Sequence, residues 1–176
     1  MQVMRRTLLM ASAAAAMVVL AAGVSEGADI GDRVPEAAGA AGVRVPAAEA
    51  DLAHHGHASL WAGRIGVWLE SDNHGPAQVA DATVRLSFSV PVSVTGGGPL
   101  PPVCLWGGDR VILCRTGALR AGGAGHGIAL DLLAAGSPTE VVVGVATAWS
   151  DGAIDQNHAN DQHTVLVPAT GDGYVF

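Results

Sequence analysis

Lysine is absent from this 176-residue chain, and all nine basic residues are arginine. Without lysine the chain has no Walker A phosphate loop, no Schiff-base lysine and no lysine general base. All four methionines lie within the first 17 residues, so helix-forming Lys and Met are missing from everything that follows. Val, Thr, Gly and Pro abound there instead, and this composition favours strands and turns.

Positive charge is also scarce, because 16 acidic residues face nine arginines and leave a net charge of −7. Loss of Arg5 and Arg6 with a cleaved leader would take this to −9. An acidic surface repels phosphate groups, so we expect no nucleic-acid partner and no docking on anionic lipid.

The amino-terminal segment has the pattern of a secretory signal. Arg5 and Arg6 precede an uncharged apolar run over residues 8–24, and Ala21 and Gly23 put small residues at the −3 and −1 positions of a cleavage site. We predict a signal peptide over residues 1–23, with a second cleavage site after Ser25. The alternative is a retained membrane anchor, since about 17 apolar residues just span a bilayer. The arginine pair fits both a general secretory and a twin-arginine signal.

The rest of the chain changes character near residue 50. Residues 24–50 lack aromatic groups and steady periodicity, so they bury too little to offset their ordering entropy, and we expect a disordered, flexible linker. Residues 51–170 form one predicted domain with turn residues about every ten positions. The predicted strands lie near 51–57, 63–71, 80–90, 102–106, 111–115, 126–133, 139–149 and 162–168.

The hydrophobic pattern of these segments predicts an all-β fold. Val84, Leu86 and Phe88 alternate with polar neighbours, as in a sheet with one face on a core. The valine run over residues 141–145 suits a central strand buried on both faces. Seven to eight strands in about 118 residues indicate an immunoglobulin-like β-sandwich, preceded by the signal peptide and linker.

The chain has two cysteines, Cys104 and Cys114, on either side of a predicted hairpin. If the hairpin centres on Asp109, with Gly107 and Gly108 in the turn, the two cysteines lie opposite each other. An exported chain should oxidise such a pair to a disulfide. The alternative, a metal-binding or redox thiol pair, lacks the C-x-x-C spacing.

Several short motifs, taken in order, resemble the bacterial surface-protein repeat called domain of unknown function 11. The motifs are Asp51-Leu52-Ala53, Asn73-His74-Gly75-Pro76, Val90-Pro91, Cys104, Gly108, Cys114, Gly117, Leu119, Gly122, Asp155, Asn157, Asn160 and the strand 164–167. The resemblance covers roughly residues 51–168 and implies a non-catalytic immunoglobulin-like module of exported, wall-associated proteins. This chain departs from the family in having Asn160-Asp161 in place of Asn-Asn, and it carries one copy.

Three imidazoles near the domain start, His54, His55 and His57, form a candidate metal site. Such a cluster suits Cu(II), Ni(II) or Zn(II), although adjacent strand residues point to opposite faces, so only His55 and His57 share one. The other interpretation is a polar edge strand or loop. Residues 151–161 are rich in side-chain oxygen, which fits either Ca²⁺ or a loop whose Asx side chains cap their own turns.

The four tryptophans are the large apolar anchors of the chain. Trp68 and Trp149 lie inside apolar runs and are predicted in the core, whereas Trp61 is the one expected on the surface. An exposed tryptophan on a sandwich stacks on sugars or on a protein partner.

The chain has no nucleophile elbow, zincin motif or dinucleotide fingerprint, so we expect no enzyme and no cofactor. The sequence predicts a secreted or envelope-associated module with a structural or adhesive role. Its expected partner is a protein or a cell-wall glycan, without stable membrane insertion after signal cleavage. The alternative function is a small extracytoplasmic metal-binding protein that uses His54, His55 and His57.

Overall fold

The structure is a computed structural model that describes residues 47–123, 125 and 127–176. The predicted signal peptide, and the predicted linker up to residue 46, lie outside the described residues. Strands dominate the described part, which contains no α-helix.

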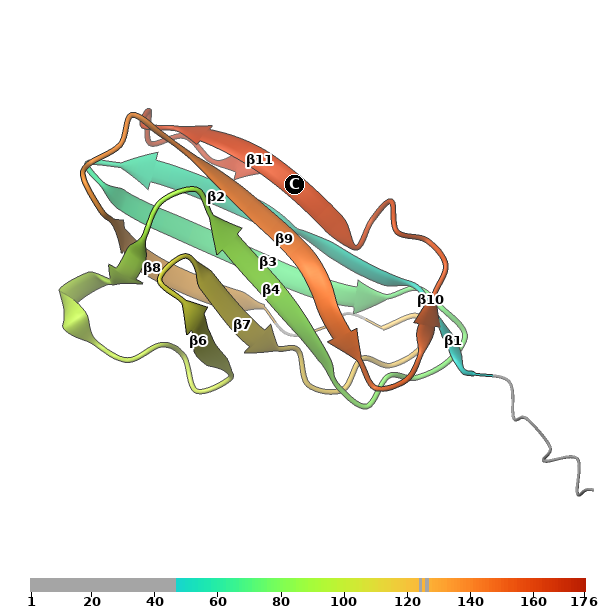
Figure 1. Cartoon of the computed structure of the whole chain (residues 1–176). Helices are drawn as coiled ribbons and strands as arrows, with labels where there is room; N and C mark the ends of the chain where they lie inside the picture. The colour runs from blue at the N-terminus through green and yellow to red at the C-terminus, as the bar shows by residue number, and fades with distance from the viewer. Residues whose placement is uncertain (1–46, 124, 126) are drawn as a thin grey trace, which may run out of the picture. The chain divides into compact units, whose positions relative to one another are not determined.

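Ten of the strands form two antiparallel sheets of five strands each (Figure 1). Sheet I has the order β11 (Gln162–Pro168), β9 (Glu140–Ser150), β4 (Ala82–Phe88), β7 (Val111–Arg115) and β6 (Cys104–Gly108). Sheet II has the order β12 (Tyr174–Val175), β2 (Leu52–Trp61), β3 (Arg64–Asn73), β8 (Ile128–Ala134) and β5 (Val92–Val94). A short parallel pair, β1 (Glu49–Ala50) and β10 (Ile154–Asp155), completes the strands.

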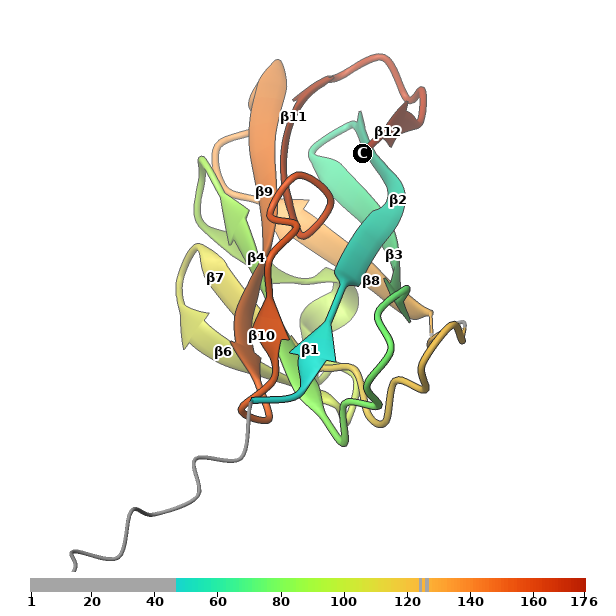
Figure 2. The same cartoon turned by 90° about the vertical axis from the view of Figure 1, so that its right-hand side faces the viewer.

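The two sheets pack face to face, as the end-on view shows (Figure 2). The core between them is almost wholly aliphatic, with Leu60, Ile65 and Leu69 from sheet II meeting Leu86 and Ile112 from sheet I. Branched aliphatic side chains fit a pleated, half-buried surface well, so burial and strand preference act together here. The predicted all-β sandwich is confirmed; its immunoglobulin-like type stays a prediction.

Alternation along the strands explains most of the burial. In β4, Val84, Leu86 and Phe88 are buried while Arg85 points outward, as the sequence predicts. The prediction for the valine run is wrong in one respect. Strand β9 is an inner strand of its sheet, between β11 and β4, but Val142 is exposed, because the outer face of sheet I is open to solvent. An antiparallel sheet commonly buries one face only.

The strands extend beyond the range predicted for the folded domain, 51–170. Strand β1 lies within the predicted linker, and β12 pairs with β2 as an edge strand of sheet II. Strand β5 is not among the predicted strands, because three residues carry too little periodicity. The turn between β2 and β3 is the residue pair Ala62-Gly63, both with positive φ (49° and 77°), as a two-residue hairpin turn requires.

Candidate functional site

The histidine cluster lies on β2, where alternation separates its members. His54 is buried between the sheets, whereas His55 and His57 are exposed on the outer face of sheet II. The prediction that only His55 and His57 share a face is therefore confirmed.

The interior histidine joins the two sheets through its ring nitrogens. His54 Nδ1 lies 2.9 Å from Ser71 Oγ on β3, and Nε2 lies 2.8 Å from Thr147 Oγ1 on β9. Burial lowers the pKa of His54 from 6.5 to about 4, while the carboxylate of Asp161 opposes this shift. His54 is therefore a neutral, fully hydrogen-bonded imidazole at neutral pH.

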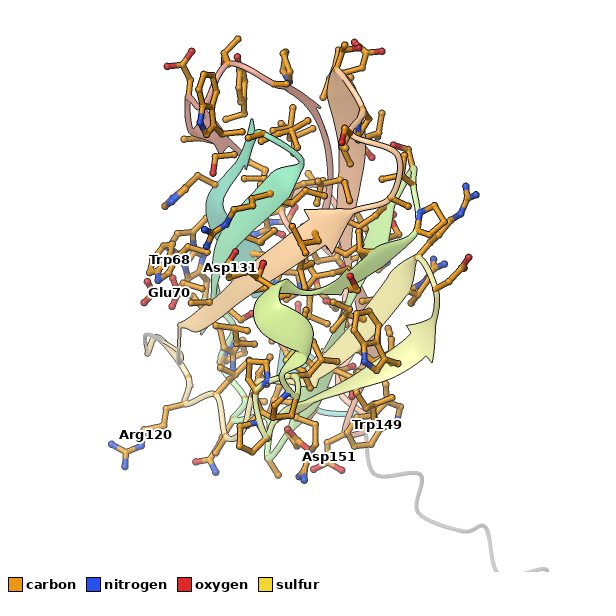
Figure 3. The ribbon with its side chains drawn as sticks, turned by 90° about the vertical axis from the view of Figure 1, so that its left-hand side faces the viewer. Trp68, Glu70, Arg120, Asp131, Trp149 and Asp151 are labelled. Atoms are coloured by element: carbon orange, nitrogen blue, oxygen red, sulfur yellow. A yellow bond between two sulfur atoms is a disulfide. The ribbon has the colours of Figure 1, made fainter. Side chains whose placement is uncertain are left out.

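Both exposed histidines lie beside Trp68 of the adjacent strand β3. Figure 3 labels Trp68 together with Glu70 of the same strand. The ring of His57 stacks on the indole at a centroid distance of 6.0 Å, and the ring of His55 meets it edge-on at 6.5 Å. Carboxylates of Glu70 and Asp72 lie 3.8 Å and 3.6 Å from the His55 ring nitrogens. This histidine–tryptophan face combines aromatic, basic and acidic groups on one sheet surface.

The three imidazoles do not converge as a metal site would require. His54 points into the core with both nitrogens engaged, and Asp51 Oδ1 accepts hydrogen bonds from the amides of Asn157 and Asn160. Among the residues that the structure describes, no group of three or more His, Cys, Asp or Glu side chains is arranged to hold a metal ion. Structural metal sites generally need four such ligands, and catalytic ones three.

The predicted disulfide is confirmed. Cys104 and Cys114 are bonded, with their Cα atoms 4.1 Å apart on the paired strands β6 and β7 of one sheet. The predicted centre of the hairpin at Asp109 is confirmed, because the turn consists of Asp109 and Arg110, but the prediction of Gly107 and Gly108 in the turn is wrong. Gly107 and Gly108 belong to β6, and a register shift lies between Trp106 and Gly108, so a bulge takes up residues that the sequence predicts in the turn.

All four tryptophans are on the surface. The exposed fractions are 64 % for Trp61, 37 % for Trp68, 42 % for Trp106 and 51 % for Trp149. The prediction is confirmed for Trp61 and wrong for Trp68 and Trp149. Trp68 lies between the inward-facing Val67 and Leu69, so strict alternation along β3 carries the signal that it faces outward.

A bulge in β9 decides the orientation of Trp149. Val143, Val145 and Thr147 point inward, so alternation alone would place Trp149 in the core. The register shifts at this point, because Val84 pairs with Thr147 but the preceding Thr83 pairs with Trp149. The extra residue turns the indole to the outer face of sheet I.

The oxygen-rich loop over residues 151–161 uses many of its oxygens within the fold itself. Asp155 Oδ1 accepts from the backbone N–H of Asn157, as in an Asx turn, and Asp155 Oδ2 accepts from that of Leu52. Asp161 Oδ2 lies 3.2 Å from His158 Nδ1. The Asx interpretation is confirmed for Asp155, while Asn160 Oδ1 and Asp161 Oδ1 are buried without a hydrogen-bond partner among the described residues.

The fold and these surfaces define a class: a disulfide-bonded all-β sandwich that displays aromatic side chains on both outer faces. Comparison with models of known protein families gave no match, and comparison with curated protein sequences gave none either. Within the described residues, no helix has the length and apolar character needed to cross a membrane.

Proposed function

We propose that this protein is an exported, non-catalytic binding module of the bacterial cell envelope, of immunoglobulin-like type and akin to the domain of unknown function 11. The observation that carries the proposal is the exposure of all four tryptophans. The core is filled mainly by smaller aliphatic side chains, whereas the tryptophans, the largest apolar side chains of the protein, lie at the surface.

Exposed tryptophans are informative because an indole combines a large apolar area with one hydrogen-bond donor. Such side chains are enriched where a protein stacks on sugars or anchors a partner protein. Here Trp61 and Trp68 lie on the outer face of sheet II, and Trp149 lies on that of sheet I. Trp68 and Trp149 are labelled in Figure 3. A cell-wall glycan or an envelope protein is a suitable partner for tryptophans exposed in this way.

Two further features support an extracytoplasmic place of action. A disulfide between Cys104 and Cys114 is compatible with an oxidising compartment, and residues 1–23 have the pattern of a signal peptide. The acidic net charge of −7 argues against a nucleic-acid partner.

Among the described residues, one histidine lies within hydrogen-bonding distance of a serine hydroxyl, and the burial of this pair agrees with a non-catalytic role. His54 Nδ1 lies 2.9 Å from Ser71 Oγ, but both residues are buried between the sheets. A nucleophile and its base must reach a substrate carbonyl, and this buried pair is not accessible to a substrate. Its evident role is to tie β2 to β3 and β9.

Sedimentation of the purified secreted protein with isolated cell walls tests the proposal. We expect the unaltered protein to sediment with the walls and a triple variant, Trp61→Ala, Trp68→Ala and Trp149→Ala, to stay in solution. Ile154→Ala is the matched control, because it removes an exposed apolar side chain without an indole. All three tryptophan side chains are exposed, so the melting temperature should change little. Equal sedimentation of all three proteins would contradict the proposal.

A further inference from the structure

A shallow groove runs over β9 on the outer face of sheet I. It consists of two adjoining hollows of about 220 Å³ and 300 Å³, which share Ser87, Gly144 and Thr164. The groove is open above β9 because the residues of β9 at this point are small. A Cβ atom added at Gly144 would lie only 2.5 Å from Ser87 Oγ. The groove follows the line of β4, β9 and β11, which lie side by side in Figure 1.

The sheet register places the groove's polar side chains in two rows. Arg85, Ala146 and Gln162 form one row across β4, β9 and β11. Ser87, Gly144 and Thr164 form the next. Each row therefore sets one hydrogen-bonding side chain on either side of a small residue.

Trp149 extends the groove at one end. It pairs with Thr83, the outward-facing residue that precedes Arg85 by two positions on β4. Ala146 pairs with Arg85, two positions further along β4 than Thr83, so Trp149 and Ala146 lie about 7 Å apart along the strand. The indole is half exposed and thus offers an aromatic surface in line with the polar rows.

The charge of the groove is opposite to that of the whole chain. None of the residues that line either hollow is acidic, and Arg85 is their one arginine. Arg64 and Arg115 pair with Asp131 and Asp81. No carboxylate in the described part of the chain forms an ion pair with Arg85, so its guanidinium remains available to an external anion.

We propose that this groove binds a polysaccharide that carries carboxylate groups. The Arg85 guanidinium pairs with a sugar carboxylate, since its planar fork matches that anion bidentately. Ser87, Gln162 and Thr164 exchange hydrogen bonds with ring hydroxyls, and Trp149 stacks on the apolar face of a neighbouring sugar. This inference rests on the proposed function and names the ligand class for one of its two aromatic faces.

Calorimetry with an oligogalacturonate and its methyl ester tests the choice of ligand, because the ester keeps the sugar chain and removes its charge. We expect the purified protein to bind the acid at least tenfold more tightly than the ester, a gap of about 1.4 kcal/mol. Arg85→Gln should weaken binding of the acid about tenfold and leave binding of the ester unchanged. Trp149→Ala should weaken both.

Arg120→Gln is the matched control, because it removes an exposed arginine on a loop away from Trp149 (Figure 3). It should bind the acid as the unaltered protein does. Equal binding of acid and ester, or an Arg85→Gln variant with full affinity for the acid, would overturn the inference. Tighter binding of a glycerol-phosphate polymer would overturn the choice of carboxylate.

Failure of this inference is distinguishable from failure of the proposed function. If cell-wall sedimentation depends on Trp61 and Trp68 but not on Arg85 or Trp149, the groove is not the glycan site and the envelope-binding role stands. If the unaltered protein sediments with no cell wall, the proposed function fails as well.

Discussion

Protonation of His54 is expected to destabilise the sandwich as the pH falls from 6.5 towards 4. The ring is buried between the sheets, and its pKa is lowered to about 4 chiefly by burial. In the unfolded chain the same imidazole has its ordinary pKa of 6.5. The unfolded state therefore binds the proton more tightly, so stability is fully present above pH 6.5 and is lost as the pH falls to about 4.

The size of the effect follows from the shift. A fall of the pKa from 6.5 to about 4 corresponds to about 3 kcal/mol of unfolding free energy, lost over that interval. Small domains typically have about 5–15 kcal/mol in all, so the loss should be plain. Asp161 and Asp155 raise the pKa of His54, while His163 and His55 lower it. Asp161→Asn should therefore lower the pKa of His54 further.

Urea unfolding between pH 4 and pH 7 measures this, with His54→Gln as the variant that cannot titrate. Glutamine retains hydrogen-bonding capacity towards Ser71 and Thr147. The unaltered protein should lose about 3 kcal/mol more than His54→Gln over the interval. His57→Gln, which removes an exposed ring, should behave as the unaltered protein. The reasoning is refuted if the pH profiles of His54→Gln and the unaltered protein coincide, or if the His54 resonances titrate near pH 6.5.

Three further outcomes are expected. Replacing Cys104 and Cys114 by serine should lower the free energy of unfolding by about 3 kcal/mol, because the disulfide removes conformational entropy from the unfolded chain. Thermal unfolding measures this loss, and an unchanged melting temperature would contradict it. Ala62→Asn should stabilise the β2–β3 turn by a few tenths of a kcal/mol, since asparagine tolerates positive φ better than alanine, and chemical denaturation should register the gain. Calorimetry with Cu(II) should give weak binding that His55→Ala/His57→Ala reduces; nanomolar affinity would revive the metal-binding alternative.

The sequence by itself determined what depends on neighbours along the chain. Alternation in β4 and β8 identifies the buried face, because successive strand residues point to opposite sides. The pairing of Cys104 with Cys114 follows from a short hairpin, whose register is a local property. The same alternation places His54 on the opposite face of β2 from His55 and His57.

The tertiary structure alone decided what depends on irregular register and on distant strands. One extra residue in β9 turns Trp149 from the core to the surface, and no periodicity in that segment indicates the bulge. The contact of His54 with Thr147 spans 93 positions, and the row from Arg85 to Gln162 crosses three strands. These groups meet because sheet pairing and sheet stacking bring distant segments together. For that reason the residue pattern along the chain does not reveal the groove on sheet I.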